Sequence, residues 1–184
     1  MASSTAIGAV EIVSIPKGME AADAMLKAAD VQLVTAATAC PGKYIVVVFG
    51  EVAEVNAAVQ AGLHVAKEKT IDSLVIPNVH DQVMPAINAC SSVGRVEAIG
   101  SEELFSICGA IEAADAAAKA ATVDLIEIRL ARGLGGKSFF VLTGDVASVR
   151  AGIEAGRAVC ERRGLVSDCV VIPSPHPELI KAIL

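Results

Sequence analysis

The chain has 184 residues, a formal net charge of −6, 54% hydrophobic residues and only 3% aromatic ones. No basic run or aromatic-interleaved lysine and arginine patch is present, which argues against a nucleic-acid partner. The longest strongly apolar run, at residues 44–49, is far below the roughly 18 residues of a membrane helix, and residues 1–6 do not resemble a signal peptide, so we expect a cytoplasmic protein with no membrane partner.

A repeat divides the sequence into two copies of one module. Residues 20–33 read EAADAMLKAADVQL and residues 112–125 read EAADAAAKAATVDL, which gives ten identities in fourteen positions at an offset of 92. An offset of 92 residues between the copies makes each copy the size of a domain. We therefore expect a first domain at residues 1–91 and a second at residues 92–184.

In chain order, each copy predicts a strand, a helix, two strands, a helix, a strand and a short helical tail. The expected ranges are 7–13, 17–29, 31–39, 43–49, 51–67, 73–76 and 81–89 in the first copy. In the second copy they are 96–102, 105–121, 123–131, 137–143, 145–163, 169–172 and 177–184. Because a tight turn joins the two middle strands, they should pair antiparallel. The order predicts an α+β fold with helices on one face of each sheet.

The turn between the middle strands differs between the copies. The first copy has Cys40, Pro41 and Gly42 there, and the second has the longer run ARGLGG at residues 131–136. Glycine permits positive φ and the close approach of a neighbour or ligand. The run GLGGKS does not fit a nucleotide phosphate loop, because Ala131 stands where that motif needs glycine and a strand follows in place of a helix.

The five cysteines are odd in number and contain no CxxC pair, which argues against a disulfide framework. Cys40 lies in a turn, where side chains are commonly exposed and a thiol is available. One cysteine makes no metal site, but a threefold axis beside this turn would gather three thiolates. Iron–sulfur clusters usually take four cysteines. The other four lie in helical or strand patterns, where we expect small buried side chains: Cys90, Cys108, Cys160 and Cys169.

The remaining polar candidates have plain structural interpretations. Lys27 and Lys119 are expected to be solvated charges at helix ends. His80 and His176 each follow a proline by three residues, and a helix start or a satisfied polar contact accounts for both. Nucleophile and base residues do not group at a suitable spacing, so the sequence predicts no enzyme.

Three patterns, each present twice, resemble the bacterial microcompartment shell domain. They are the alanine-rich helix with its lysine at residues 21–31, the tight turn that ends in Gly-Lys at residues 42–43, and VIPxxH at residues 75–80. Their repeats lie at 113–123, 136–137 and 171–176. The resemblance covers nearly the whole chain without circular permutation. It implies two tandem shell domains, each with a four-stranded antiparallel sheet and helices, and it is closest to tandem members from propanediol-utilisation compartments.

The resemblance also implies an assembly and a cofactor. Tandem members form homotrimers with pseudo-sixfold symmetry that tile with other shell proteins around enzymes. Their middle turns line a pore. In the propanediol-utilisation type, the first-domain pore cysteine of each subunit, here Cys40, holds a shared [4Fe–4S] cluster for electron transfer, with a redox enzyme as a further partner. The implied pore-lining residues are Cys40, Pro41, Gly42, Arg132, Gly133, Leu134, Gly135 and Gly136.

The family's edge lysine, which meets neighbouring tiles, corresponds to Lys27 and Lys119. Many single-domain members carry an arginine after the VIP proline, but here those edge positions are Asn78 and Ser174. Contacts between tiles through that arginine are therefore not expected.

Two other functions stay open from the residues. One is a metal-free tile whose pore, set by the glycine loop, passes metabolites. The other is a cytosolic small-molecule sensor on a duplicated scaffold, which would bind a ligand in a cleft and form no sheets. A measurement of iron content distinguishes the metal-free tile from the cluster-bearing tile. Assembly into sheets distinguishes either tile from the sensor.

Overall fold

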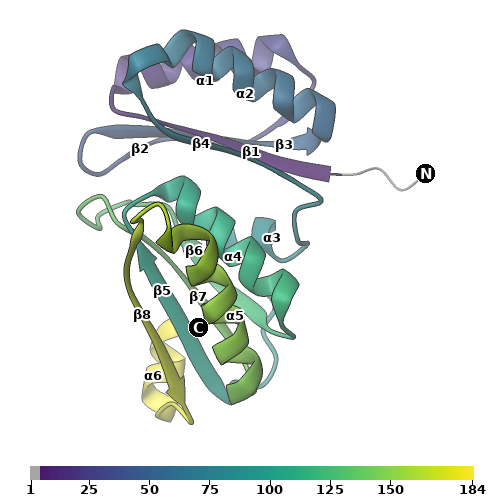
Figure 1. Ribbon diagram of the computed structural model, residues 1–184, viewed down its shortest axis with the longest axis vertical. Coiled ribbons are helices and arrows are strands. Elements are labelled where there is room, and N and C mark those ends of the chain that lie inside the picture. Colours follow the sequence, from purple (N-terminus) through teal and green to yellow (C-terminus); the bar gives the residue numbers. More distant parts are fainter. Residues whose placement is uncertain (1–4) are drawn as a thin grey trace. The chain divides into compact units, whose positions relative to one another are not determined.

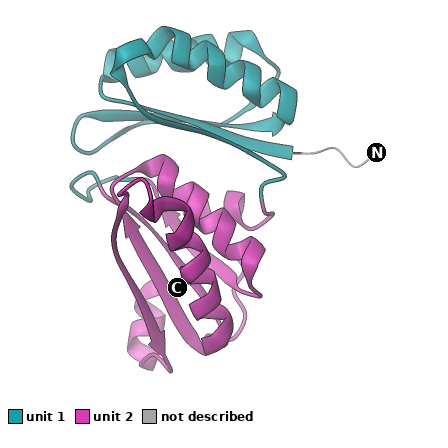
Figure 2. Cartoon of the chain, viewed as in Figure 1, with its two compact units in different colours: residues 1–79, 131–136 teal, residues 80–130, 137–184 magenta. Residues whose placement is uncertain are grey.

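The computed structural model describes residues 5–184, which form two compact units, each with a four-stranded antiparallel sheet (Figure 1). Of the described residues, 5–79 and 131–136 belong to the first unit, and 80–130 and 137–184 belong to the second (Figure 2). Short elements with apolar faces need a second layer to cover them, and in each unit two helices provide that layer.

The first sheet has the order β2-β3-β1-β4. Its strands are β1 (Thr5–Ile12), β2 (Gln32–Ala39), β3 (Lys43–Glu51) and β4 (Thr70–Pro77). Helices α1 (Ile15–Ala28) and α2 (Val52–Ala66) lie together on one face, as Figure 1 shows, and a short 3₁₀ turn, η1 (Lys67–Lys69), leads into β4. The core between the layers is aliphatic, with Ile12, Met25 and Val46 fully buried.

The second sheet repeats this topology with the order β6-β7-β5-β8. Its strands are β5 (Ala98–Leu104), β6 (Asp124–Arg129), β7 (Ser138–Gly144) and β8 (Val166–Pro173), and its main helices are α4 (Ile107–Ala120) and α5 (Val146–Glu161). Two short helices complete the unit. The first, α3 (Val83–Ile87), packs against β6, and the second, α6 (Pro177–Ile183), places Ile180 and Ile183 against Ile99 and Val141.

Local sequence explains where the helices begin. The hydroxyl of Ser14 accepts a hydrogen bond from the N–H of Lys17 ahead of α1, and Ser106 accepts one from Gly109 ahead of α4. Serine is a favoured N-cap because it satisfies a backbone donor that has no partner inside the helix. Both capping serines lie at the repeat offset of 92, so the duplicated sequence also duplicates the start of the helix.

The predicted order of elements is confirmed in both copies, but many bounds were shifted and three lengths differ most. The last strands were expected at 73–76 and 169–172, whereas β4 and β8 span eight residues each, and the tail expected at 81–89 forms helix only in α3. Both strands lie at a sheet edge. Polar residues such as Asp72 and Asp168 are tolerated there because one side of an edge strand faces solvent. These polar residues interrupt the apolar pattern, so the sequence predicted strands that were too short.

Candidate functional site

The cysteine turn links β2 to β3 in three residues. Cys40 is half-buried with a free thiol, and Pro41 and Gly42 are exposed. Gly42 has φ +74°, a left-handed conformation that glycine adopts without steric cost. Antiparallel pairing of Ala39 with Lys43 closes the turn, so Cys40 is the first residue of a hairpin turn that a regular ladder holds.

The glycine loop of the second copy lies against this turn. Residues 131–136 leave the second sheet after β6 and pack within the first unit. The N–H of Cys40 donates a hydrogen bond of 3.0 Å to the carbonyl oxygen of Ala131. At the other end of the loop, a Cβ placed on Gly136 would lie 2.8 Å from Cδ of Pro41. The two unlike turns thus form one structural site.

A recess of about 560 Å³ opens beside the two turns. Its lining includes Cys40, Gly42, Arg132 and Gly133 together with the end of β2. The guanidinium of Arg132 is held at 3.3 Å from Oγ1 of Thr35, and Leu134 is half-buried. The lining of the recess therefore includes one thiol and one positively charged side chain.

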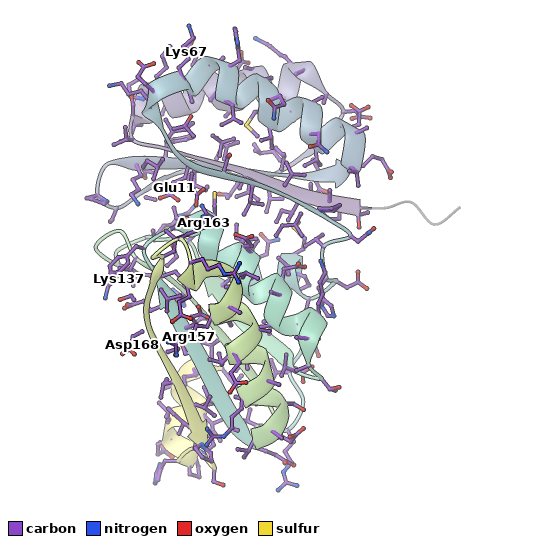
Figure 3. All side chains as sticks on the ribbon, in the orientation of Figure 1. Glu11, Lys67, Lys137, Arg157, Arg163 and Asp168 are labelled. Carbon is purple, nitrogen blue, oxygen red and sulfur yellow. The ribbon has the colours of Figure 1, made fainter. Side chains whose placement is uncertain are left out.

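An ion pair stands at the base of each turn. Lys43 follows the cysteine turn and contacts Glu11 at 2.7 Å, and Lys137 follows the glycine loop and contacts Glu103 at 2.7 Å. Figure 3 labels one partner of each pair, Glu11 and Lys137. The hydrogen bond from Lys137 lowers the pKa of Glu103, and a second from Ser167 acts in the same direction. Equivalent lysine–glutamate ion pairs therefore hold the ends of two turns that differ in sequence and length.

The cysteines divide less simply than the sequence predicted. Cys108 and Cys160 are fully buried, as expected. Cys90 is exposed and Cys169 is half-buried, so the expectation of burial was wrong for both. Cys90 lies outside the helices and strands, just after the end of α3, and Cys169 lies on the edge strand β8. All four belong to the second unit, which leaves Cys40 as the cysteine of the first.

The expected edge residues lie on exposed parts of both copies. Lys27 pairs with Asp23 and Lys119 with Asp115, each at 2.6 Å in the last turn of a helix. The Lys27 side chain is 75% exposed and that of Lys119 is 40% exposed, which fits solvated helix-end charges. Asn78 and Ser174 are exposed and directly follow β4 and β8, with φ values of +51° and +49°.

His176 begins a helix and His80 makes polar contacts ahead of α3, and the sequence predicted one or the other for both. Nδ1 of His176 accepts the N–H of Glu178 at 3.2 Å as the N-cap of α6. The backbone N–H of His80 donates to Asp115 at 2.8 Å, and its ring accepts from Gln82. In these hydrogen bonds, neither histidine ring contacts a nucleophilic side chain.

Comparison of the two copies reveals a residue that the sequence reading missed. Glu102 in β5 is fully buried, and burial raises its pKa from 4.5 to about 7, against a smaller lowering by Arg157. The equivalent position in the first copy is Val10, a core residue. A carboxylate in place of a core valine is visible once the copies are aligned at the offset of 92.

Comparison with known proteins gives a consistent result. The family model of the BMC domain matches residues 6–79 and 98–175. The chain is 42% identical to the bacterial microcompartment shell protein PduT of Citrobacter freundii, over 96% of each chain. It is 38% identical over 84 residues to the shell protein EutM of Escherichia coli, which matches 46% of this chain.

A solved structure shares the complete fold. The crystal structure of a microcompartment protein from Desulfitobacterium hafniense DCB superposes with a TM-score of 0.90 at 51% identity, and the match covers 96% of this chain and 98% of that one. Over the part of the chain that the structure describes, no helix is long and apolar enough to cross a membrane.

Proposed function

Because this chain belongs to the BMC-domain family of bacterial microcompartment shell proteins, we propose that three copies form a ring whose six middle turns surround a central pore. A closed ring of three two-domain chains follows the cyclic symmetry usual for homo-oligomers. The chain is a structural shell component that assembles with other shell proteins, and it is not an enzyme. A propanediol-utilisation compartment is the setting that its sequence resemblance implies.

The pore is proposed to hold one [4Fe–4S] cluster on three Cys40 thiolates. The observation that carries this is the position of Cys40, the single cysteine of the first unit, as a free, half-buried thiol beside an open recess. One chain offers one thiolate at this site, so a cluster must be shared between chains. Three thiolates are one fewer than the usual four, which leaves one iron for another ligand.

Such a cluster would supply one-electron transfer between the two sides of the shell. The residues of this chain would hold and shield it. Cys40 would provide the ligand and Arg132 a positive charge at the recess. The ion pairs Lys43–Glu11 and Lys137–Glu103 would support the two turns. A redox enzyme on either side of the shell is the partner that this function requires.

Substitution of Cys40 by serine tests the cluster. We expect Cys40→Ser to lose the visible absorption and most of the iron of anaerobically purified protein, because serine removes the sulfur ligand. The oligomer should stay intact by size-exclusion chromatography with light scattering, since Cys40 lies outside the cores. Cys90→Ser is the matched control, because Cys90 is exposed in the second unit, and it should keep its iron. Full iron retention in Cys40→Ser would refute the assignment.

An open metabolite pore is the second candidate function. It is favoured by the glycine loop, where nothing lies within 4 Å of a Cβ built on Gly133 or Gly135. In this case Cys40 would be incidental, and anaerobically prepared protein would contain neither iron nor labile sulfide.

A further inference from the structure

We propose that the second copy's loop at residues 131–136 is a clamp that fixes the backbone of Cys40, and that Gly136 is the positioning residue of this clamp. The proposal rests on the proposed function for its purpose, which is to place a cluster ligand. The clamp itself is a property of the cluster-free protein and can be measured there.

The clamp has two points of contact. At one end, the carbonyl of Ala131 accepts the N–H of Cys40 at 3.0 Å. At the other, a Cβ on Gly136 would lie 2.8 Å from Cδ of Pro41 and 3.3 Å from the carbonyl oxygen of Cys40. A ring atom and a backbone atom cannot rotate away as a flexible side chain does, so a methyl group at residue 136 must displace the Cys40–Pro41 segment or the loop.

The clamp explains why the second turn is longer. Its backbone is left-handed at Ala131, Gly133, Gly135 and Gly136, with φ values of 55°, 74°, 62° and 92°. These repeated left-handed residues bend the loop, and both of its ends, Ala131 and Gly136, meet the Cys40–Pro41 segment. Ala131 is a non-glycine residue held in this strained region, and it is the fully buried residue whose carbonyl meets Cys40.

The loop also supplies its own controls. Gly133, Gly135 and Gly136 all have positive φ, so alanine introduces left-handed strain at each of them. A Cβ at Gly133 or Gly135 meets nothing within 4 Å, whereas one at Gly136 overlaps the cysteine turn. The difference between Gly136→Ala and Gly135→Ala therefore contains the contact with Pro41 together with the greater backbone strain of alanine at φ +92° than at +62°, and the Pro41→Ala background separates the two.

The reactivity of the Cys40 thiol reports the clamp without any cluster. Iron-free protein is treated with iodoacetamide, and the tryptic peptide of residues 28–43, in which Cys40 is the single cysteine, is followed by mass spectrometry. Over-packing of this size should raise the population of the displaced Cys40–Pro41 turn roughly tenfold. Cys40 of Gly136→Ala should therefore be alkylated about tenfold faster than Cys40 of the wild type. Gly133→Ala and Gly135→Ala should stay within about twofold. Equal rates in all four proteins, or equal acceleration in Gly135→Ala and Gly136→Ala, would overturn the clamp.

A double variant guards against simple misfolding. Pro41→Ala removes the Cδ atom that Gly136→Ala would strike, so the second substitution should add little to the alkylation rate in a Pro41→Ala background. If Gly136→Ala accelerates alkylation equally with and without Pro41, the overlap is not the cause and the proposal fails.

Anaerobic iron loading separates this proposal from the cluster. If wild-type protein takes up iron and Gly136→Ala takes up less while it alkylates faster, both are supported. If wild-type protein takes up none but Gly136→Ala still alkylates faster, the cluster fails and the clamp stands. If both take up iron equally and alkylate equally, the cluster stands and the clamp fails.

Discussion

Glu102 shows at the scale of one residue how duplicated cores diverge. A Cβ on Gly156 would lie 2.8 Å from Oε2 of Glu102, and one on the equivalent Gly62 would lie 2.7 Å from Sδ of Met25. The position of Met25 is Ala117 in the second copy. The carboxyl group thus fills the volume that a methionine fills in the first unit. Neither of its oxygens has a hydrogen-bond partner in the part of the chain that the structure describes.

The burial of Glu102 predicts a pH-dependent stability. Its pKa is raised to about 7 in the folded protein, so between pH 4.5 and 7 the folded state binds a proton that the unfolded state has lost. Stability should therefore fall as pH rises through this range and level off above it. Glu102→Gln should remove the dependence and stabilise the protein at pH 8 by up to roughly 3 kcal/mol. Urea denaturation from pH 5 to 8 at fixed protein concentration measures this.

Glu103→Gln is the contrasting variant in the adjacent position. The pKa of Glu103 is lowered, chiefly by the hydrogen bond from Lys137. Its contribution to stability is therefore present above the ordinary carboxyl pKa and is lost as the pH falls. Glu103→Gln should lower stability at pH 8, where Glu102→Gln raises it. The same sign of change in both variants would contradict this account.

At the scale of elements, the close fit of α1 on β3 depends on one glycine. A Cβ on Gly18 would lie 2.3 Å from Cβ of Tyr44. The corresponding pair in the second copy is Ala110 and Ser138. A glycine faces a large side chain in one unit and an alanine faces a small one in the other, so each pair keeps the helix against its sheet.

This pairing predicts a rescue. Gly18→Ala should destabilise the protein by roughly 1–3 kcal/mol through over-packing. Adding Tyr44→Ser, which reproduces the second copy's pair, should relieve only part of this loss, because serine lacks the ring atoms at 2.4 and 2.5 Å but keeps the Cβ at 2.3 Å. A double-mutant cycle by thermal or urea denaturation gives the coupling. Additive losses would show that α1 does not rest on Tyr44 in the way described.

The fold of the whole molecule could be predicted well from the sequence because its signals are local and occur twice. Apolar periodicity gave the main helices and central strands in order. The edge strands β4 and β8 were underestimated because Asp72 and Asp168 break their apolar pattern, and pairing with β1 and β5 extends them. Long-range pairing of this kind leaves no mark on local composition.

The site could be predicted only in its parts. The two unlike turns and the solitary Cys40 are visible in the sequence, and family resemblance supplied their expected roles. The contacts between Cys40 and Ala131 and between Pro41 and Gly136 join residues almost one hundred positions apart. Local sequence patterns do not encode these contacts. They also do not show that the second copy's loop packs within the first unit.

Iron and labile sulfide in anaerobically purified protein, counted against an oligomer mass from light scattering, test the central claim most directly. One cluster shared by three Cys40 thiolates predicts about four iron and four sulfide atoms for every three chains, in a particle of three chains. Intact trimers that contain neither iron nor sulfide would contradict the claim and leave an open pore in its place.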